Sequence, residues 1–223
     1  TIAQMSCNPA MGGVAKGQIV REIDALGGYS GIVTDRTAIQ FRMLNRSKGP
    51  AMWSPRAQND RMLFSQEWRM MLEQTPNVDF LQEMVRGLEV KNGVVTGVIT
   101  GMGNTISCKA VVLTNGTFLN GIIHIGEKQF GGGRAGEKSS KGITEQLITL
   151  GFESGRMKTG TPPRIDGRSL DYSKMEIQHG DEEPAKFSYL PVEQFAFKTK
   201  RKDEFMNGPS EQIPCYVTYT NED

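Results

Sequence analysis

The segment Ala110-Val111-Val112-Leu113 is continuously apolar, and it runs into the turn Thr114-Asn115-Gly116-Thr117. An unbroken apolar run of this length is typical of a strand covered on both faces in a parallel sheet. Upstream, Asn92-Gly93 separates the apolar runs 87–90 and 94–100, which predicts a β-hairpin. Hairpin, buried strand and glycine turn in this order favour an α/β nucleotide-binding architecture, in which ligands lie at the carboxyl ends of strands.

Two helices are expected ahead of this hairpin. The first covers residues 18–26, whose apolar positions share one helical face, and it ends at Gly27-Gly28. The second begins with Ser54 as N-cap and Pro55 at the first helical position, and it ends before Thr75-Pro76. Both predictions rest on local signals alone.

The remaining elements are expected from shorter signals. We expect a strand at 78–81, no regular structure in the glycine-rich residues 129–142, a helix over 143–150 and a rigid turn at 158–164. Beyond residue 165 the sequence becomes polar with scattered aromatic residues, so we place a domain boundary between 1–165 and 166–223. A final strand is expected over 213–220, where it enters an inserted domain.

Composition excludes several classes of protein. The 223 residues carry 26 Lys+Arg against 25 Asp+Glu, a net charge of +1, and 37% of them are hydrophobic, which argues against a disordered or polybasic chain. No apolar run approaches the roughly 20 residues that span a bilayer, and no signal peptide opens the chain, so a soluble protein is expected. The chain begins at Thr1 without Met, and we expect it to be a piece of something longer.

Cysteine and histidine are scarce. Three widely spaced cysteines form no disulfide framework and no C-x-x-C pair, which favours a reducing compartment such as the cytoplasm. With only His124 and His179 available, a histidine-based metal site is not expected. Metal is therefore left out of the predicted chemistry.

Cys7 is the first candidate for chemistry. It lies just before Gly12, Gly13 and Gly17, where free backbone N–H groups, the positive end of a helix and Lys16 could stabilise a thiolate. Such a thiolate can add to C6 of a uracil and make C5 ready to capture a one-carbon electrophile. The alternative is a small buried residue beside a turn.

The glycine turns are candidates for cofactor binding. Gly116 and Thr117 follow the predicted buried strand, as in the second glycine turn of flavoproteins, where only glycine permits close approach of the backbone. The loop 131–136 could present backbone donors to a flavin ring or a phosphate, and Ser139 and Ser140 could add hydroxyls. A common strand turn and a mobile surface loop remain the alternatives.

Positive charge is concentrated in two stretches. Residues 42–61 hold five basic residues and one acidic residue beside Phe41 and Trp53, a composition that can hold phosphates and stack bases. Residues 134–168 carry a surplus of three positive charges. An ordinary solvated helix face is the alternative for both.

Taken together, these motifs resemble one family, the tRNA uridine 5-carboxymethylaminomethyl modification enzymes (MnmG/GidA). The likeness runs from end to end, and the segments that carry it are 6–17, 22–28, 40–45, 48–51, 56–58, 113–119, 132–136 and 158–164. The resemblance implies an FAD-binding Rossmann-like core with two dinucleotide-binding domains, followed by the start of an inserted α+β domain. On this basis 1–165 is part of the FAD-binding domain and 166–223 begins the insertion.

The resemblance also implies an activity. With a GTPase partner (MnmE-like) in a heterotetramer, such an enzyme modifies C5 of the wobble uridine of certain tRNAs, using FAD, NADH, methylenetetrahydrofolate, and glycine or ammonium. Cys7 matches the family's first catalytic cysteine, and Val85 and Ser140 match two positions that contact FAD. The resemblance further implies that the protein forms a homodimer in the cytoplasm and does not associate with a membrane.

The chain departs from the family by omission. It lacks the N-terminal glycine fingerprint that holds the ADP half of FAD, and it ends before the family's second catalytic cysteine, for which Cys215 should not be mistaken. We therefore expect the piece to be inactive by itself. Two other functions remain open: a folate- and FAD-dependent tRNA 5-methyluridine methyltransferase, and a non-catalytic RNA-binding module.

Overall fold

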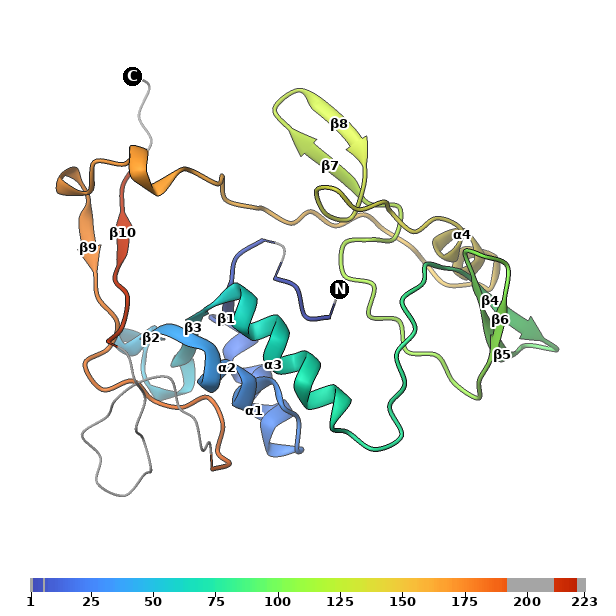
Figure 1. The fold of residues 1–223 in the computed structure, drawn as a ribbon, viewed down its shortest axis with the longest axis horizontal. Coiled ribbons are helices and arrows are strands. Elements are labelled where there is room, and N and C mark those ends of the chain that lie inside the picture. The colour runs from blue at the N-terminus through green and yellow to red at the C-terminus, as the bar shows by residue number, and fades with distance from the viewer. Residues whose placement is uncertain (1, 6, 192–210, 220–223) are drawn as a thin grey trace. The chain divides into compact units, whose positions relative to one another are not determined.

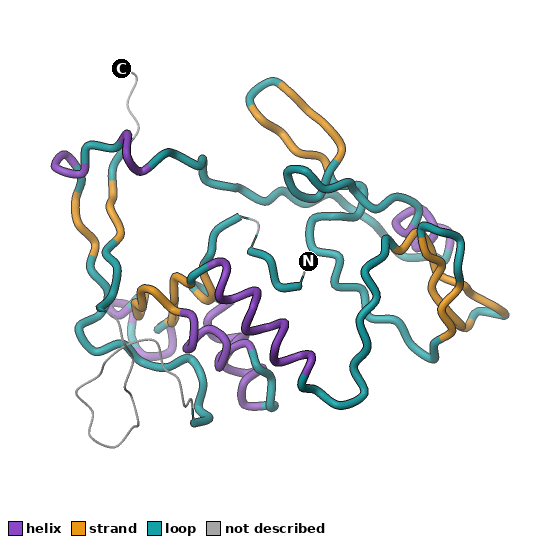
Figure 2. The backbone as a smooth tube through the Cα atoms, in the orientation of Figure 1, coloured by secondary structure: helices purple, strands orange, loops and turns teal. Residues whose placement is uncertain are grey.

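The computed structural model describes residues 2–5, 7–191 and 211–219. Within these residues the chain forms two compact units, one from 1–78 with 160–223 and one from 79–159. We call them the first and second unit and describe each by itself. Figure 1 labels their helices and strands, and Figure 2 shows that long loops connect them.

The first unit is built on a three-stranded antiparallel sheet in the order β1-β3-β2. Helices α1 and α2 pack against β3, and α3 packs against α2. The side chains of Val20, Ala38, Phe41, Ala57 and Phe187 form its core. The elements of this part are β1 (Ala10–Gly12), α1 (Lys16–Ala25), α2 (Ser30–Thr37), β2 (Ala38–Leu44), η1 (Arg46–Lys48), η2 (Pro50–Met52), β3 (Ser54–Asn59) and α3 (Arg61–Glu73).

The later part of the first unit is mostly extended chain. The short 3-10 helices η3 (Gly167–Ser169) and η4 (Tyr172–Lys174) precede β9 (Glu176–Gln178), which pairs antiparallel with β10 (Cys215–Val217). β10 confirms the centre of the strand expected over 213–220, whose last residue lies outside the described residues.

The second unit contains a three-stranded antiparallel sheet in the order β4-β5-β6, a separate hairpin and one helix. Its elements are β4 (Val85–Lys91), β5 (Val94–Thr100), β6 (Thr105–Ser107), β7 (Ile122–Ile125), β8 (Lys128–Gly131) and α4 (Ile143–Thr149). The predicted hairpin is confirmed as β4 and β5, because Asn92 and Gly93 both adopt the positive φ of its turn. The predicted helix 143–150 is confirmed as α4.

The predicted buried strand at 110–113 is wrong. These residues form no strand, and Val112 is 84% exposed. A parallel strand needs hydrogen-bonding neighbours, and among the described residues no strand pairs with this segment. All paired strands of the described chain are antiparallel, and the single parallel contact is the isolated bridge between Leu119 and Ser140.

Other local predictions also need correction. The strand expected at 78–81 is absent, and 158–164 forms extended chain rather than a turn. The glycine-rich region 129–142 was expected to have no regular structure, but its first residues belong to β8. This strand is held by its hydrogen bonds to β7, which local sequence does not reveal. The predicted boundary at 165/166 concerns an inserted domain and stays a prediction.

The predicted start of the second helix is displaced. Ser54 and Pro55 lie in β3, and α3 is capped instead by Asp60, whose carboxylate accepts from the N–H groups of Met62 and Leu63 at 2.9 and 3.0 Å. The first helix is confirmed as α1, which ends before Gly27 with a φ of 91°.

Candidate functional site

The loop around Cys7 leads into the edge of the first sheet. β1 pairs with β3, and Gly12 and Gly13 then turn the chain toward α1 with φ near 92° and 94°. The side chain of Cys7 is half-buried. A reactive thiol needs this partial access to solvent.

Two residues from a distant segment contact Cys7. The Thr161 hydroxyl donates a hydrogen bond to Sγ of Cys7 at 3.3 Å, and the Arg164 guanidinium donates to the carbonyl oxygen of Cys7. Both lie in the extended segment 158–164, more than 150 residues along the chain, and both belong to the first unit. The sequence marked this segment as a motif, but no sequence signal paired it with Cys7.

The amide groups that were expected to hold the sulfur are engaged elsewhere. The N–H of Gly13 donates to the carbonyl of Pro55 at 2.9 Å, and the N–H of Gly17 donates to the carbonyl of Gly13 at 2.7 Å. Lys16 donates through Nζ to the carbonyl of Ala10 at 3.2 Å. The contact to the sulfur therefore comes from a hydroxyl rather than from this backbone cradle.

In the second unit, a hydrogen bond joins two of the predicted cofactor positions, and a second bond reaches the residue next to a third. The Ser140 hydroxyl donates to the carbonyl of Val85 at 2.8 Å, and its N–H donates to the carbonyl of Phe118 at 2.8 Å, directly after Thr117. Asn120 in turn donates its N–H to the carbonyl of Ser140 at 2.9 Å. We call these residues, with Gly116, the Ser140 cluster.

Gly116 and Thr117 form the exposed side of the Ser140 cluster. Gly116 has a φ of 52°, and no atom lies within 4 Å of the place where a Cβ would stand. The Thr117 hydroxyl donates to the carbonyl of Gly133 at 2.6 Å, which ties the turn to the glycine-rich loop. The Arg134 guanidinium lies 5.9 Å from the centre of the Phe118 ring and pairs with Glu137. The backbone at Gly116 is therefore open to solvent, while the hydrogen bond of Thr117 holds the turn in place.

Hydrogen bonds also connect the N-terminus of α4 to the Ser140 cluster. Glu145 accepts from the N–H of Gly142 at 3.0 Å and from the Asn120 side chain at 2.7 Å. The backbone hydrogen bond at Glu145 itself is the main cause that lowers the pKa of its carboxyl, and the bond from Asn120 adds to it. A Cβ at Gly142 would lie 2.7 Å from the carbonyl oxygen of Arg86, so only glycine fits between α4 and β4.

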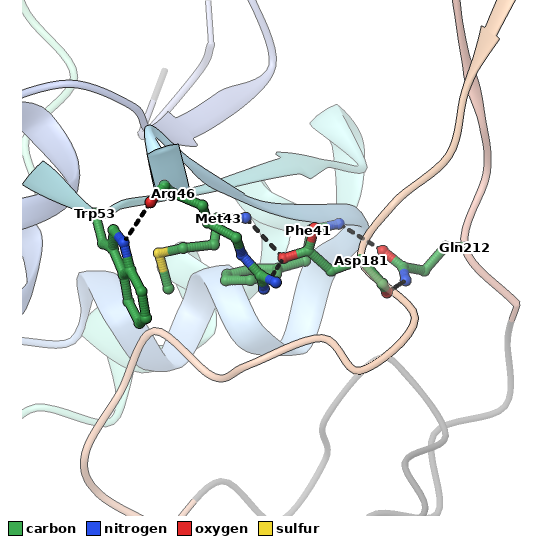
Figure 3. A network of polar contacts seen from close by, with 6 residues as sticks. All are labelled: Phe41, Met43, Arg46, Trp53, Asp181 and Gln212. Atoms are coloured by element: carbon green, nitrogen blue, oxygen red, sulfur yellow. Dashed lines mark hydrogen bonds and ion pairs between the residues drawn. The ribbon is translucent and has the colours of Figure 1, made fainter. Parts of the chain in front are cut away.

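The first basic stretch is partly neutralised by a polar network (Figure 3). Asp181 accepts from the Arg46 guanidinium and from the N–H of Met43, both at 2.8 Å. Gln212 accepts from the N–H of Phe41 at 2.7 Å and donates to the carbonyl of Asp181 at 2.5 Å. These contacts cover the free edge of β2, which is a structural role.

The aromatic residues of that stretch differ in exposure. Phe41 is 2% exposed and meets the Phe187 ring edge-on at 6.2 Å, so the prediction that it stacks on bases is wrong. It belongs to the core because its strand, β2, turns that side chain inward. Trp53 remains partly exposed and donates through Nε1 to the carbonyl of Arg46 at 3.2 Å.

Some basic side chains of the second stretch are also engaged in contacts within the protein. Besides the contacts of Arg134 and Arg164, Arg168 forms an ion pair with Asp166 at 2.7 Å. Within the described residues, no group of three or more His, Cys, Asp or Glu side chains could hold a metal ion. No helix in the same part of the chain is long and apolar enough to cross a membrane.

The fold and the two sites define a class: a mixed α/β protein with a half-buried thiol beside one glycine turn and a second glycine turn whose backbone is open on one side. The sequence matches, over residues 1–223, the family described as "Glucose inhibited division protein A", and the chain belongs to that family. The predicted family and fold class are thereby confirmed.

Individual relatives agree with this assignment. The chain is 71% identical over 222 residues to the tRNA uridine 5-carboxymethylaminomethyl modification enzyme MnmG of Cytophaga hutchinsonii, covering 100% of this chain and 34% of that protein. It is 67% identical to the protein of the same name from Flavobacterium johnsoniae, covering 99% and 33%. The solved structure of Aquifex aeolicus GidA matches with a TM-score of 0.83 and 46% identity, covering 96% and 34%. The chain thus spans about a third of the length of these relatives.

Proposed function

We propose that this chain is part of an enzyme that installs the 5-carboxymethylaminomethyl, or aminomethyl, group on the wobble uridine of tRNA. The observation that carries the proposal is the 71% identity along the whole chain to a relative named for that modification. The match extends over both units, so the segments that hold Cys7 and the Ser140 cluster lie within the matched range.

FAD is the cofactor that fits the Ser140 cluster. Val85, Gly116, Thr117 and Ser140 would hold it, and the open side of Gly116 supports this, because a backbone that approaches a flavin must carry no Cβ on that side. When bound, the flavin supplies hydride transfer. The hydroxyls of Thr117 and Ser140 already donate within the protein, so their part is to keep the turn in shape.

Cys7 would act as a thiol nucleophile or as a proton-transfer group. In the first role, its thiolate would add to C6 of the uracil ring, which moves electron density to C5 and lets C5 attack a folate-derived methylene group. Loss of the C5 proton and departure of the sulfur restore the ring, and the folate nitrogen then leaves as the nitrogen of glycine or ammonium takes its place on the new methylene carbon. The contacts from Thr161 and Arg164 support this role, because they fix the thiol on a loop that remains accessible.

The finer assignments follow from the same proposal. NADH and methylenetetrahydrofolate would be cosubstrates, and a GTPase would be the partner in a heterotetramer built on a homodimer. The enzyme would act on tRNA in the cytoplasm. Arg42 and Arg56 of the first stretch form no ion pair within the described part of the chain, and they are candidates for phosphate contacts.

The test is a Cys7→Ser substitution in the complete gene product, introduced into a strain that lacks the gene. We expect the modified nucleoside to disappear from tRNA while the purified variant keeps its flavin absorbance, and Cys108→Ser to behave as the unaltered protein. Retained modification in the Cys7→Ser strain would remove Cys7 from the mechanism.

The same strain separates the other functions. Loss of 5-methyluridine instead of the wobble modification would identify a methyltransferase. Salt-dependent tRNA binding by a flavin-free preparation, with no change in nucleosides, would identify an RNA-binding module.

A further inference from the structure

One short segment contacts Cys7 at two points. Thr161 contacts the sulfur and Arg164 contacts the main-chain carbonyl of the same residue. A side-chain contact alone would leave the backbone of the loop free to move, and a backbone contact alone would leave the thiol free to rotate. Together they restrict both.

The sequence between these two residues suits this task. Pro162 and Pro163 hold φ near −65° and keep the segment extended, and Thr161, which precedes a proline, is excluded from helical conformation. In an extended proline-rich chain with three residues per turn, residues three apart face the same side. Thr161 and Arg164 have this spacing, so both can reach one residue at once.

We propose that Thr161 and Arg164 are positioning residues for the Cys7 thiol, an inference that rests on the proposed role of Cys7. The Thr161 hydroxyl donates its hydrogen to sulfur and so holds the sulfur in one orientation on a loop that solvent can reach. Arg164 holds the Cys7 backbone in place beneath that hydroxyl.

The test measures the reactivity of Cys7 itself in the complete gene product. Alkylation of each cysteine by iodoacetamide at neutral pH is followed over time by peptide-resolved mass spectrometry. Cys108 and Cys215 serve as internal reference thiols. We expect Thr161→Val, which keeps the shape and removes the hydroxyl, to slow alkylation of Cys7 by about fivefold or more. Thr161→Ser, which restores a hydroxyl, should react at close to the original rate.

Arg164 is tested in the same assay. Arg164→Leu should slow alkylation of Cys7 about threefold, while Arg164→Lys should retain most of the rate because an ammonium group can donate to the same carbonyl. In the Thr161→Val background, Arg164→Leu should add little, since Arg164 acts by keeping the sulfur within reach of the Thr161 hydroxyl.

The results distinguish the inference from the proposed function. An unchanged or faster alkylation of Cys7 in Thr161→Val would overturn the inference, and so would an equal change at all three cysteines, which indicates general loosening of the structure. Retained tRNA modification in Cys7→Ser would instead overturn the proposed function, whatever the alkylation rates.

Discussion

Gly12 and Gly13 are neighbours with the same backbone conformation but different surroundings. Both have φ near 90°, which L-residues with a side chain rarely adopt. A Cβ on Gly12 would overlap the carbonyl oxygen of Pro55 and lie 2.6 Å from the Phe187 ring, whereas a Cβ on Gly13 would meet no atom within 4 Å. The pair therefore separates backbone strain from steric overlap.

Alanine substitutions at these two positions should differ in their effect on stability. We expect Gly13→Ala to lower the free energy of unfolding by about 1–2 kcal/mol, the strain of the left-handed conformation alone. Gly12→Ala should cost at least about 3 kcal/mol, because β1 must also move away from β3 and from the core at Phe187. Urea denaturation monitored by circular dichroism measures both, and equal losses would contradict the packing around Gly12.

At this scale, the sequence predicted the glycine turns of the Cys7 loop but not the contacts that hold the cysteine. The glycines pointed to the Cys7 loop because positive φ is a local property that glycine alone tolerates well. The contact from Thr161 to Cys7 joins residues more than 150 positions apart, and no local pattern encodes such a pairing. The roles of Cys7, Val85, Gly116, Thr117 and Ser140 stay predictions.

At the scale of elements, two buried carboxylates fasten the segment 185–190 to the helices of the first unit. Asp35 of α2 accepts from the N–H groups of Phe187 and Ser188 at 2.7 and 2.9 Å, and Asp24 of α1 accepts from the N–H of Tyr189 at 2.8 Å. Burial is the largest influence on Asp35 and raises its pKa from 3.8 to about 7, against the lowering effect of the two N–H groups.

This raised pKa predicts how stability depends on pH. The folded state keeps a proton on Asp35 that the unfolded chain releases, so the free energy of unfolding should fall as pH rises from about 4 to about 7 and then level off. Between pH 5 and pH 8, the titration of Asp35 should lower the free energy of unfolding by about 2–3 kcal/mol.

The measurement is the melting temperature at several pH values for the unaltered protein and for Asp35→Asn. The variant should lose this part of the pH dependence, although it also gives up one of the two backbone hydrogen bonds. Asp60→Asn, which keeps the cap of α3, is the matched control and should retain the slope. An identical slope in Asp35→Asn would show that Asp35 is ionised throughout this range.

Elements with complete local signals were the ones that sequence predicted. The hairpin of β4 and β5 carries Asn92-Gly93 at its turn, and α1 and α4 both end at a glycine with positive φ. Ser54-Pro55 also has the local signature of a helix start, but pairing of β3 with β1 and β2 overrides it, and Asp60 caps α3 six residues later. The run 110–113 failed because a parallel strand depends on partners that local sequence does not reveal.

At the scale of the whole molecule, the two candidate sites belong to different compact units. The Cys7 loop and its contacts from Thr161 and Arg164 lie in the first unit, and the Ser140 cluster lies in the second. The hydrogen bonds that maintain one site are therefore separate from those that maintain the other. A substitution confined to one unit should alter one property at a time.

Ser140 and its neighbour Ser139 provide this test in the complete gene product. Ser140→Ala removes the hydrogen bond to the part-buried carbonyl of Val85, which links the two sides of the Ser140 cluster, so we expect the purified protein to contain several-fold less flavin. Ser139→Ala, a partly exposed position next to it, should keep its flavin. Neither change should alter the alkylation rate of Cys7. If Ser140→Ala kept its flavin, the Ser140 cluster would be a structural junction rather than a cofactor site, while slower alkylation of Cys7 in that variant would mean that the two units are energetically coupled.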